Sequence, residues 1–162
     1  MVHSCKNHPI IRLATSFDPL EQFVLDSAIT GLEAGRAREI LESALADDEC
    51  LVHVSSSNEI DGFVITNARA FFGRDFVKLL AVSSPQQRTG VGSALLRAAA
   101  TSARTETIFS STNESNVAMR ALFEKEGWTL SGVLTGIDEG DPEMVFWHHG
   151  SGEWNERGSV AH

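Results

Sequence analysis

The stretch Gln87-Arg88-Thr89-Gly90-Val91-Gly92 constrains the fold of this chain more than any other. It follows a strand-like segment, FVKLLAV at 76–82, and leads into a helix-like apolar stripe that begins near Val91. Glycine permits positive φ and lets the main chain approach a ligand closely. The first N–H groups of a helix lack partners within the helix, and the helix dipole favours anions there. The stretch therefore predicts a phosphate-binding loop between a strand and a helix.

Length and composition limit the classes of protein that fit. The chain has 162 residues, of which 42% are hydrophobic, so we expect one globular domain over 1–150 and a flexible tail over 151–162. The net charge of -9 argues against sequence-independent binding to nucleic acid, which needs Lys and Arg. We find no apolar stretch long enough to cross a bilayer and no signal-peptide pattern, so we expect a cytoplasmic protein without a membrane partner. Cys5 and Cys50 fit neither a disulfide framework nor a zinc spacing, and no metal site is expected.

Helix-start and helix-stop signals locate the first helix. Asp18 is a candidate N-cap, Pro19 suits the first helical position and Glu21 suits the capping-box position. Gly31 is expected to end this helix. In the same way, Ser115 is a candidate N-cap for a later helix that Gly127 ends.

Hydrophobic periodicity predicts the remaining elements and their order. The middle of the chain reads as an antiparallel meander of three strands. The whole order is β-α-α-β-β-β-α-β-α-β-β, which predicts a mixed α/β sheet rather than a doubly wound one. The predicted strands cover 10–14, 50–55, 59–68, 74–82, 107–111, 128–135 and 143–148, and the predicted helices cover 18–31, 35–46, a segment from 91, and 115–126.

A second motif, NVAMRALFEKEGW at 116–128, joins the first one to suggest a family. It is similar to the Asn-x-x-Ala-x-x-Leu-Tyr-Glu-Lys-x-Gly-Phe helix of the GCN5-related N-acetyltransferase (GNAT) superfamily. The Gln-Arg-x-Gly-x-Gly run at the fourth strand-to-helix junction also resembles that superfamily. The resemblance covers most of 10–148 and is strongest over 77–128.

The resemblance implies that the ligand is acetyl-coenzyme A (acetyl-CoA). Its pyrophosphate is expected on main-chain amides of the glycine loop, with Arg88 adding positive charge, and its pantetheine arm along the end of the fourth strand. An N–H of Leu80 or Val82 is expected to stabilise the oxyanion that develops on the thioester in a cleft between the fourth and fifth strands. The expected cofactor-binding residues are Leu80, Ala81, Val82, Gln87, Arg88, Thr89, Gly90, Val91, Gly92, Ser93, Asn116 and Phe123.

The implied reaction is direct attack of a neutral amine on the thioester, which requires a base for the ammonium proton. Family members often carry a tyrosine that protonates the leaving thiolate, but Phe123 stands there and the chain has no tyrosine. Some relatives place a glutamate base on the fifth strand, where this chain has Ser111. Glu143 is the leading candidate base. Asp141, Asp75 and His53 are the alternatives.

The sequence favours an N-acetyltransferase whose acceptor is a primary amine of a small molecule or a protein. A non-catalytic module that binds or senses acyl-CoA remains an alternative, since the tyrosine is missing. A nucleotide-binding protein is disfavoured because the loop lacks the Lys and Ser/Thr of a P-loop. The resemblance leaves open a homodimer formed through the final strands.

Overall fold

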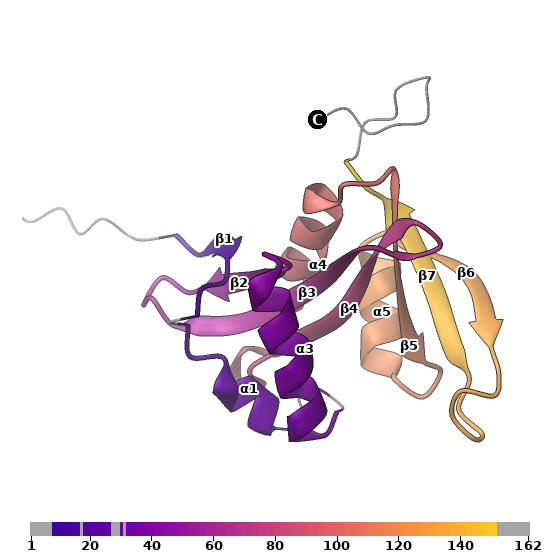
Figure 1. Ribbon diagram of the computed structural model, residues 1–162, viewed down its shortest axis with the longest axis horizontal. Coiled ribbons are helices and arrows are strands. Elements are labelled where there is room, and N and C mark those ends of the chain that lie inside the picture. The colour runs from indigo at the N-terminus through magenta and orange to yellow at the C-terminus, as the bar shows by residue number, and fades with distance from the viewer. Residues whose placement is uncertain (1–7, 17, 27–29, 31, 152–162) are drawn as a thin grey trace, which may run out of the picture. The chain divides into compact units, whose positions relative to one another are not determined.

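The computed structural model describes residues 8–16, 18–26, 30 and 32–151 (Figure 1). Cys5, Gly31 with its expected helix end, and the expected tail after Ser151 lie outside the described residues. The strands are β1 (Ile10–Leu13), β2 (Cys50–Val54), β3 (Ile60–Phe71), β4 (Arg74–Val82), β5 (Thr107–Asn113), β6 (Thr129–Leu134) and β7 (Glu143–His149). The helices are α1 (Glu21–Leu25), α3 (Ala34–Ala46), α4 (Val91–Ser102), α5 (Val117–Lys125) and the 3-10 helix η1 (Ser84–Gln86).

The strands form one seven-stranded sheet with the order β1-β2-β3-β4-β5-β7-β6. The pairs β1–β2, β2–β3, β5–β7 and β6–β7 are antiparallel, whereas β4 and β5 are parallel. The parallel register runs from Asp75 opposite Ile108 to Val77 opposite Ser110. The predicted mixed α/β sheet is confirmed.

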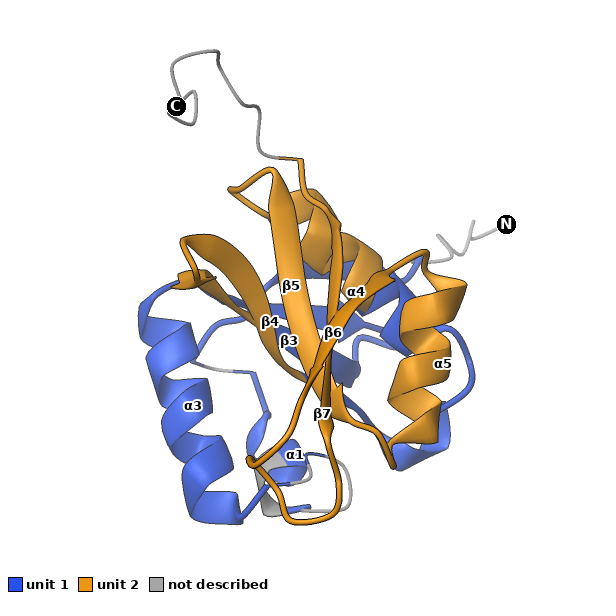
Figure 2. Ribbon diagram, turned by 90° about the vertical axis from the view of Figure 1, so that its right-hand side faces the viewer, with its two compact units in different colours: residues 1–65, 80–95 blue, residues 66–79, 96–162 orange. Residues whose placement is uncertain are grey.

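The chain divides into two compact units that interleave along the sequence (Figure 2). Unit 1 comprises 1–65 and 80–95, and unit 2 comprises 66–79 and 96–162. No helix in the described part of the chain is long and apolar enough to cross a membrane.

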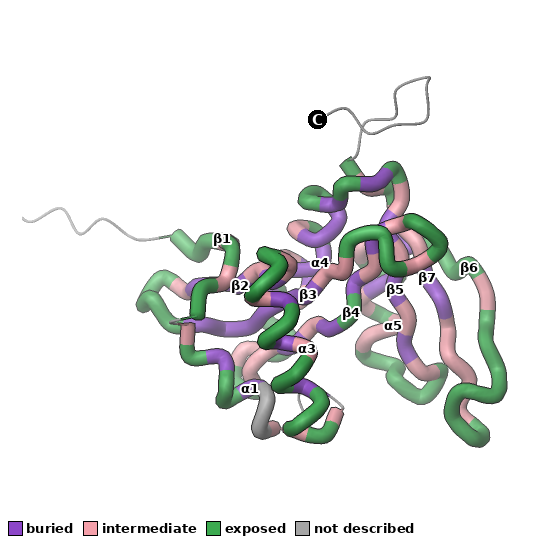
Figure 3. The backbone as a smooth tube through the Cα atoms, viewed as in Figure 1, coloured by how far each residue is buried: buried purple, intermediate pink, exposed green. Residues whose placement is uncertain are grey.

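The core of unit 1 lies along β2 and β3, where buried positions follow one another closely (Figure 3). Phe63 of β3 and Phe23 of α1 are both fully buried and meet edge to face, with ring centroids 5.5 Å apart. The neighbouring Gly62 faces Leu95 of α4 instead. Because successive strand residues point to opposite faces, α1 and the first turns of α4 cover opposite faces of β3. This packing positions the segment between β4 and α4.

The core of unit 2 is an aromatic cluster between α5 and β7. The Phe123 ring is fully buried and stacks on Phe146 at 4.6 Å, with Trp128 at 5.2 Å. On the surface, Arg97 donates two hydrogen bonds of 3.1 Å to the carboxylate of Glu126 at the end of α5. Burial of these large rings fixes α5 against the sheet.

Two predicted helix caps are wrong. The first turn of α1 begins at Glu21 with Leu20 as N-cap, and no side chain caps it. The carboxylate of Asp18 instead accepts hydrogen bonds from Arg12, which competes with capping. The N-cap of α5 is Asn116 rather than Ser115, because Asn116 Oδ1 accepts from the N–H of Met119 at 3.1 Å.

Candidate functional site

The loop between β4 and α4 is held in shape by its own hydrogen bonds. The N–H of Ser83 donates to the carbonyl of Asp61 at 2.8 Å, which ties the start of the loop to β3. Gln87 Nε2 donates to the carbonyl of Val82 at 3.3 Å, and Thr89 Oγ1 donates to the carbonyl of Gln86 at 2.6 Å. The chain then turns through positive φ, at 63° for Arg88 and 97° for Gly90. The second value favours glycine, so the sequence motif has a conformational reason.

A row of main-chain donors is left free where this loop enters α4. The helix's first main-chain hydrogen bond runs from the N–H of Ala94 to the carbonyl of Gly90 at 3.0 Å. Among the described residues, nothing accepts a hydrogen bond from the N–H groups of Arg88 or of Gly90 to Ser93. Such donors, with the positive end of the helix dipole, form an anion-binding arrangement. The structure thus brings together the loop residues that the sequence predicted.

Burial alternates between successive residues at the end of β4. Ala81 is buried, and its carbonyl oxygen lies where a side chain on Gly62 would stand. Leu80 and Val82 are half-buried. The expected roles of these residues beside a pantetheine arm and a thioester remain predictions.

The two predicted cofactor residues of α5 have structural partners in unit 2. The side-chain carbonyl of Asn116 caps the helix, which leaves its amide nitrogen for other contacts. Phe123 is fully buried against Phe146 and Trp128. Its proposed contact with the cofactor stays a prediction.

Two of the candidate bases serve as structural ties. Asp141 accepts from the N–H of Ser115 at 3.0 Å and from its hydroxyl at 2.5 Å. Asp75 is buried and accepts from the main-chain N–H groups of Arg69 at 3.0 Å and Arg104 at 2.7 Å. A carboxylate that accepts from two protein donors is best explained as a structural contact between neighbouring segments.

The other two candidates differ from each other. His53 is buried on β2, and its Nδ1 lies 3.0 Å from Oδ2 of Asp61. Glu143 is half-buried at the start of β7, and its carboxylate has no hydrogen-bond or ion-pair partner among the described residues. Of the four candidate bases, Glu143 is therefore the one whose side chain has no hydrogen-bond or ion-pair partner in the described part of the chain.

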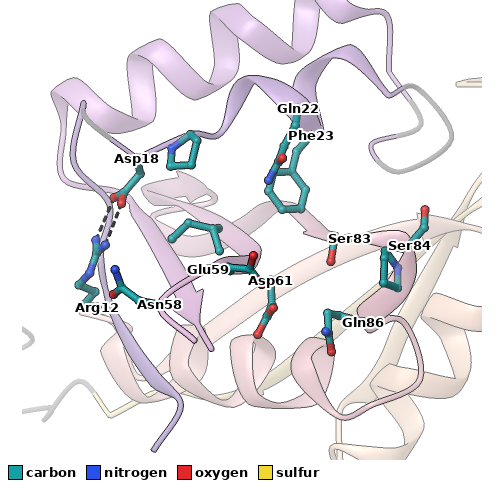
Figure 4. A pocket seen from close by; sticks show the side chains of 13 residues that line it. Arg12, Asp18, Gln22, Phe23, Asn58, Glu59, Asp61, Ser83, Ser84 and Gln86 are labelled. Atoms are coloured by element: carbon teal, nitrogen blue, oxygen red, sulfur yellow. Dashed lines mark hydrogen bonds and ion pairs between the residues drawn. The ribbon is translucent and has the colours of Figure 1, made fainter. Parts of the chain in front are cut away.

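Unit 1 also contains a cavity of about 770 Å³ that the sequence did not predict (Figure 4). In the view of Figure 4, Arg12 and Asp18 lie on one side, Ser83, Ser84 and Gln86 on the other, and Asp61 between them. These residues come from β1, the segment before α1, the start of β3, and η1 with the residue before it. No local motif joins segments so far apart in the sequence, so only the fold could reveal the cavity.

The cysteine in the described part of the chain is not a reactive thiol. Cys50 is 1% exposed, and burial raises the pKa of its thiol to about 12. A thiol needs to be ionised to act as a nucleophile. The described residues contain no group of three or more His, Cys, Asp or Glu that could hold a metal ion.

The ion pair between Arg12 and Asp18, at the wall of the cavity, makes the free energy of unfolding depend on pH. Hydrogen bonds from Arg12 at 2.7 and 2.9 Å lower the pKa of Asp18 from 3.8 to about 2. The stabilisation is therefore complete above pH 3.8 and is lost as the pH falls towards 2. We expect Asp18→Asn to lower the free energy of unfolding at pH 7 by about 1 kcal/mol, since solvent screens the partly exposed Arg12. Urea titrations between pH 7 and pH 2 test this.

The difference between Asp18→Asn and the wild type should shrink as the pH falls from about 4 to about 2, near the two pKa values. Glu42→Gln, an exposed substitution on α3, is the control and should change stability by less than about 0.5 kcal/mol. A difference between Asp18→Asn and the wild type that is independent of pH would refute the assignment.

A strand that leads through a glycine-containing loop to a helix start with free amides is an arrangement of α/β proteins that suits an anionic ligand. A profile of the Acetyltransferase (GNAT) family matches residues 18–128, more than half of the chain. This chain therefore belongs to the GNAT acetyltransferase family.

Solved structures show the same fold. A GNAT-family acetyltransferase from Bacillus cereus has 30% sequence identity and a TM-score of 0.78, over 89% of this chain and 99% of that chain. A GNAT-family acetyltransferase from Elizabethkingia anophelis, solved with acetyl-CoA bound, has 18% identity and a TM-score of 0.69, over 89% and 99% of the two chains. Ard1 from Thermoplasma volcanium has 15% identity and a TM-score of 0.68, over 89% and 99%. No curated protein matches this chain in sequence.

Proposed function

We propose that this protein transfers an acetyl group from acetyl-CoA to a primary amine by direct attack. The free main-chain donors from Gly90 to Ser93, with that of Arg88, are the observation that carries the proposal. A diphosphate is the anionic part of coenzyme A, and helix-start amides suit it. Family membership and the related structure solved with acetyl-CoA support the same ligand. The acceptor is a small molecule or a protein.

Different residues of this chain have different roles in the proposed reaction. The loop after β4 holds the diphosphate and so fixes the position of the thioester relative to the acceptor, which supplies rate by orientation. An N–H of Leu80 or Val82 donates to the oxygen that becomes negative in the transition state. Glu143 accepts the proton that the ammonium loses before or during attack.

The route does not use the described cysteine, because Cys50 is buried and protonated near neutral pH. The amine therefore attacks the thioester carbon directly, and the C–S bond breaks to release the coenzyme A thiolate. Phe123 has no proton to donate to this thiolate, which takes its proton from water. A thiol of ordinary pKa, about 8.5, leaves without a dedicated acid.

Glu143→Gln is the variant that tests the base. It keeps the shape of the side chain and removes its ability to accept a proton. We expect kcat to fall by about a hundredfold, with the dissociation constant of acetyl-CoA unchanged. Thiol release from acetyl-CoA across a panel of amines measures kcat, and calorimetry measures cofactor binding.

Glu139→Gln, an exposed substitution in the β6–β7 loop that precedes Glu143, provides the matched control and should leave kcat unchanged. An unchanged kcat in Glu143→Gln would remove this residue from the mechanism. The proton would then have to pass to water or to another group.

A non-catalytic module that binds acyl-CoA is the second candidate function. The replacement of the family tyrosine by the buried Phe123 favours it. The two functions differ in turnover, since a sensor binds acetyl-CoA but releases no thiol with any amine. Absence of thiol release across the amine panel, together with intact binding of acetyl-CoA, would select the sensor.

A further inference from the structure

Unit 2 has a row of three aromatic side chains on the face of its sheet that is turned away from α5. Phe76 of β4 lies opposite Phe109 of β5, and Phe109 lies opposite Trp147 of β7. The neighbouring Phe146 stacks on Phe123 of α5, so Trp147 points to the other face of β7. The three side chains of this aromatic row are half-buried, and their rings therefore keep surface for a ligand.

A fourth ring shows how the aromatic row makes contacts. Phe71, at the end of β3, has its ring centroid 5.4 Å from that of Phe76 and 5.1 Å from that of Phe109. Both separations lie in the range of favourable ring pairs. Because one ring contacts Phe76 and Phe109 together, these two side chains share a face of the sheet. A ligand ring on the remaining surface of the aromatic row would make contacts of the same kind.

Lys78 supplies a positive charge next to the aromatic row. Burial alternates strictly along β4, where Val77 is buried, so Phe76 and Lys78 lie on the same face. Two residues of a strand span about 7 Å. Lys78 is exposed, and its ammonium has no hydrogen-bond or ion-pair partner among the described residues. The carboxylate of a ligand would form a charge-assisted hydrogen bond with this ammonium.

Glu143 supplies a negative charge farther along the same face. The register of β5 and β7 runs without interruption from Asn113 opposite Glu143 to Phe109 opposite Trp147. Glu143 and Trp147 are four residues apart, so they share a face and are separated by about 13 Å along β7. This face of unit 2 thus presents rings, an ammonium and a carboxylate. An aromatic α-amino acid carries the complementary groups: a ring, a carboxylate and an ammonium.

We propose that the acceptor is an aromatic α-amino acid whose ring lies on the aromatic row and whose carboxylate binds Lys78. Its amino group then points along β7 towards Glu143. The amine itself rests on the proposed function, whereas the ring and the carboxylate follow from the aromatic row and Lys78. The ammonium gives one proton to Glu143, directly or through a water. The nitrogen then bonds to the acetyl carbon as the C–S bond breaks, and the second proton leaves to water, which protonates the thiolate.

Acetyl transfer to three amines tests what this face selects. Phenylalanine carries both groups, 2-phenylethylamine lacks the carboxylate, and alanine lacks the ring. We expect kcat/KM for phenylalanine to exceed that for each of the other two by about tenfold or more. Equal values for phenylalanine and 2-phenylethylamine, or for phenylalanine and alanine, would overturn the proposal.

Lys78→Met removes the charge and keeps most of the length of the side chain. The preference for phenylalanine over 2-phenylethylamine should fall from about tenfold to about one, through KM rather than kcat, because a binding contact is lost. Lys125→Met, an exposed substitution in the last turn of α5, is the matched control and should keep the preference of the wild type. An unchanged preference in Lys78→Met would contradict the role of Lys78.

A binding measurement without acetyl-CoA separates this proposal from the acetyltransferase function. In the wild-type chain, 3-phenylpropionate, which has the ring and the carboxylate but no amine, should shift the NMR signal of the Trp147 indole N–H. Trp147→Phe assigns that signal. We expect 3-phenyl-1-propanol and butyrate, which each lack one of the two groups, to bind about tenfold more weakly or less.

The outcomes of this measurement are distinct. Binding of 3-phenylpropionate without acetylation of any amine would support the ligand class and refute the transfer reaction. A Trp147 signal that stays in place at millimolar 3-phenylpropionate would overturn the proposal, even if the protein acetylates other amines.

Discussion

Gly90→Asp should weaken binding of acetyl-CoA by about a thousandfold, as measured by calorimetry. Gly90 has a φ of +97°, and its own N–H is one of the free donors at the start of α4. A carboxylate at this point stands beside the expected diphosphate. Like charges about 4 Å apart repel by about 4 kcal/mol near a protein surface, which equals a factor of about a thousand in affinity.

Gly140→Asp is the matched control for this substitution. Gly140 has a φ of +75° in the β6–β7 loop, and a side chain there would meet no atom within 4 Å, as at Gly90. The two variants therefore share added charge and backbone strain, and they differ in their relation to the phosphate loop. Gly140→Asp should bind acetyl-CoA as the wild type does.

Gly90→Asn separates charge from strain, since Asn has nearly the size of Asp and no charge. We expect it to lose less affinity than Gly90→Asp. Undiminished affinity for acetyl-CoA in a folded Gly90→Asp protein would contradict the placement of the diphosphate.

Gly62→Ala should lower the free energy of unfolding by about 3 kcal/mol. A methyl group on Gly62 would stand 2.5 Å from the carbonyl oxygen of Ala81 and 3.2 Å from the side chain of Leu95. The first of these atoms belongs to the backbone of β4, so it cannot turn away as a side chain can. Relief of the clash would have to move β4 or β3, and chemical denaturation measures the cost.

Gly132→Ala provides the comparison within a strand. Gly132 lies on β6, and a side chain there would meet no atom within 4 Å. Alanine restricts the unfolded chain more than glycine does, so this variant should be unchanged or more stable by up to about 1 kcal/mol. Similar stability changes in Gly62→Ala and Gly132→Ala would show that β3 and β4 are not packed as closely as described.

The strands and helices with strong local signals could be predicted from the sequence. The apolar stripe of Val91, Leu95 and Ala99 predicted α4, and all three side chains are buried in the structure. The Gly90 position was identified because positive φ at a strand-to-helix junction favours glycine. Such signals are local in the chain, so periodicity and turn chemistry suffice to read them.

The roles of polar side chains were harder to predict from the sequence, because their hydrogen-bond partners depend on the tertiary structure. Asp18 fits a local capping pattern, yet it bonds to Arg12 on a strand. Asp75 was a candidate base, yet the main-chain N–H groups of Arg69 on β3 and of Arg104 after α4 donate to its carboxylate. A buried carboxylate takes whichever donors the packing brings to it.

The sequence by itself determined the order of the elements, the glycine loop before α4 and the family. The order and the loop follow from backbone preferences and apolar spacing, which act over a few residues, and the family follows from the resemblance of two sequence motifs. The tertiary structure alone decided that Asp61 stands at a bulge beside His53, that a cavity opens next to η1, and that Glu143 keeps a carboxylate without partners in the described chain. Strand register and packing between distant segments set these features, and no local pattern in the chain encodes them.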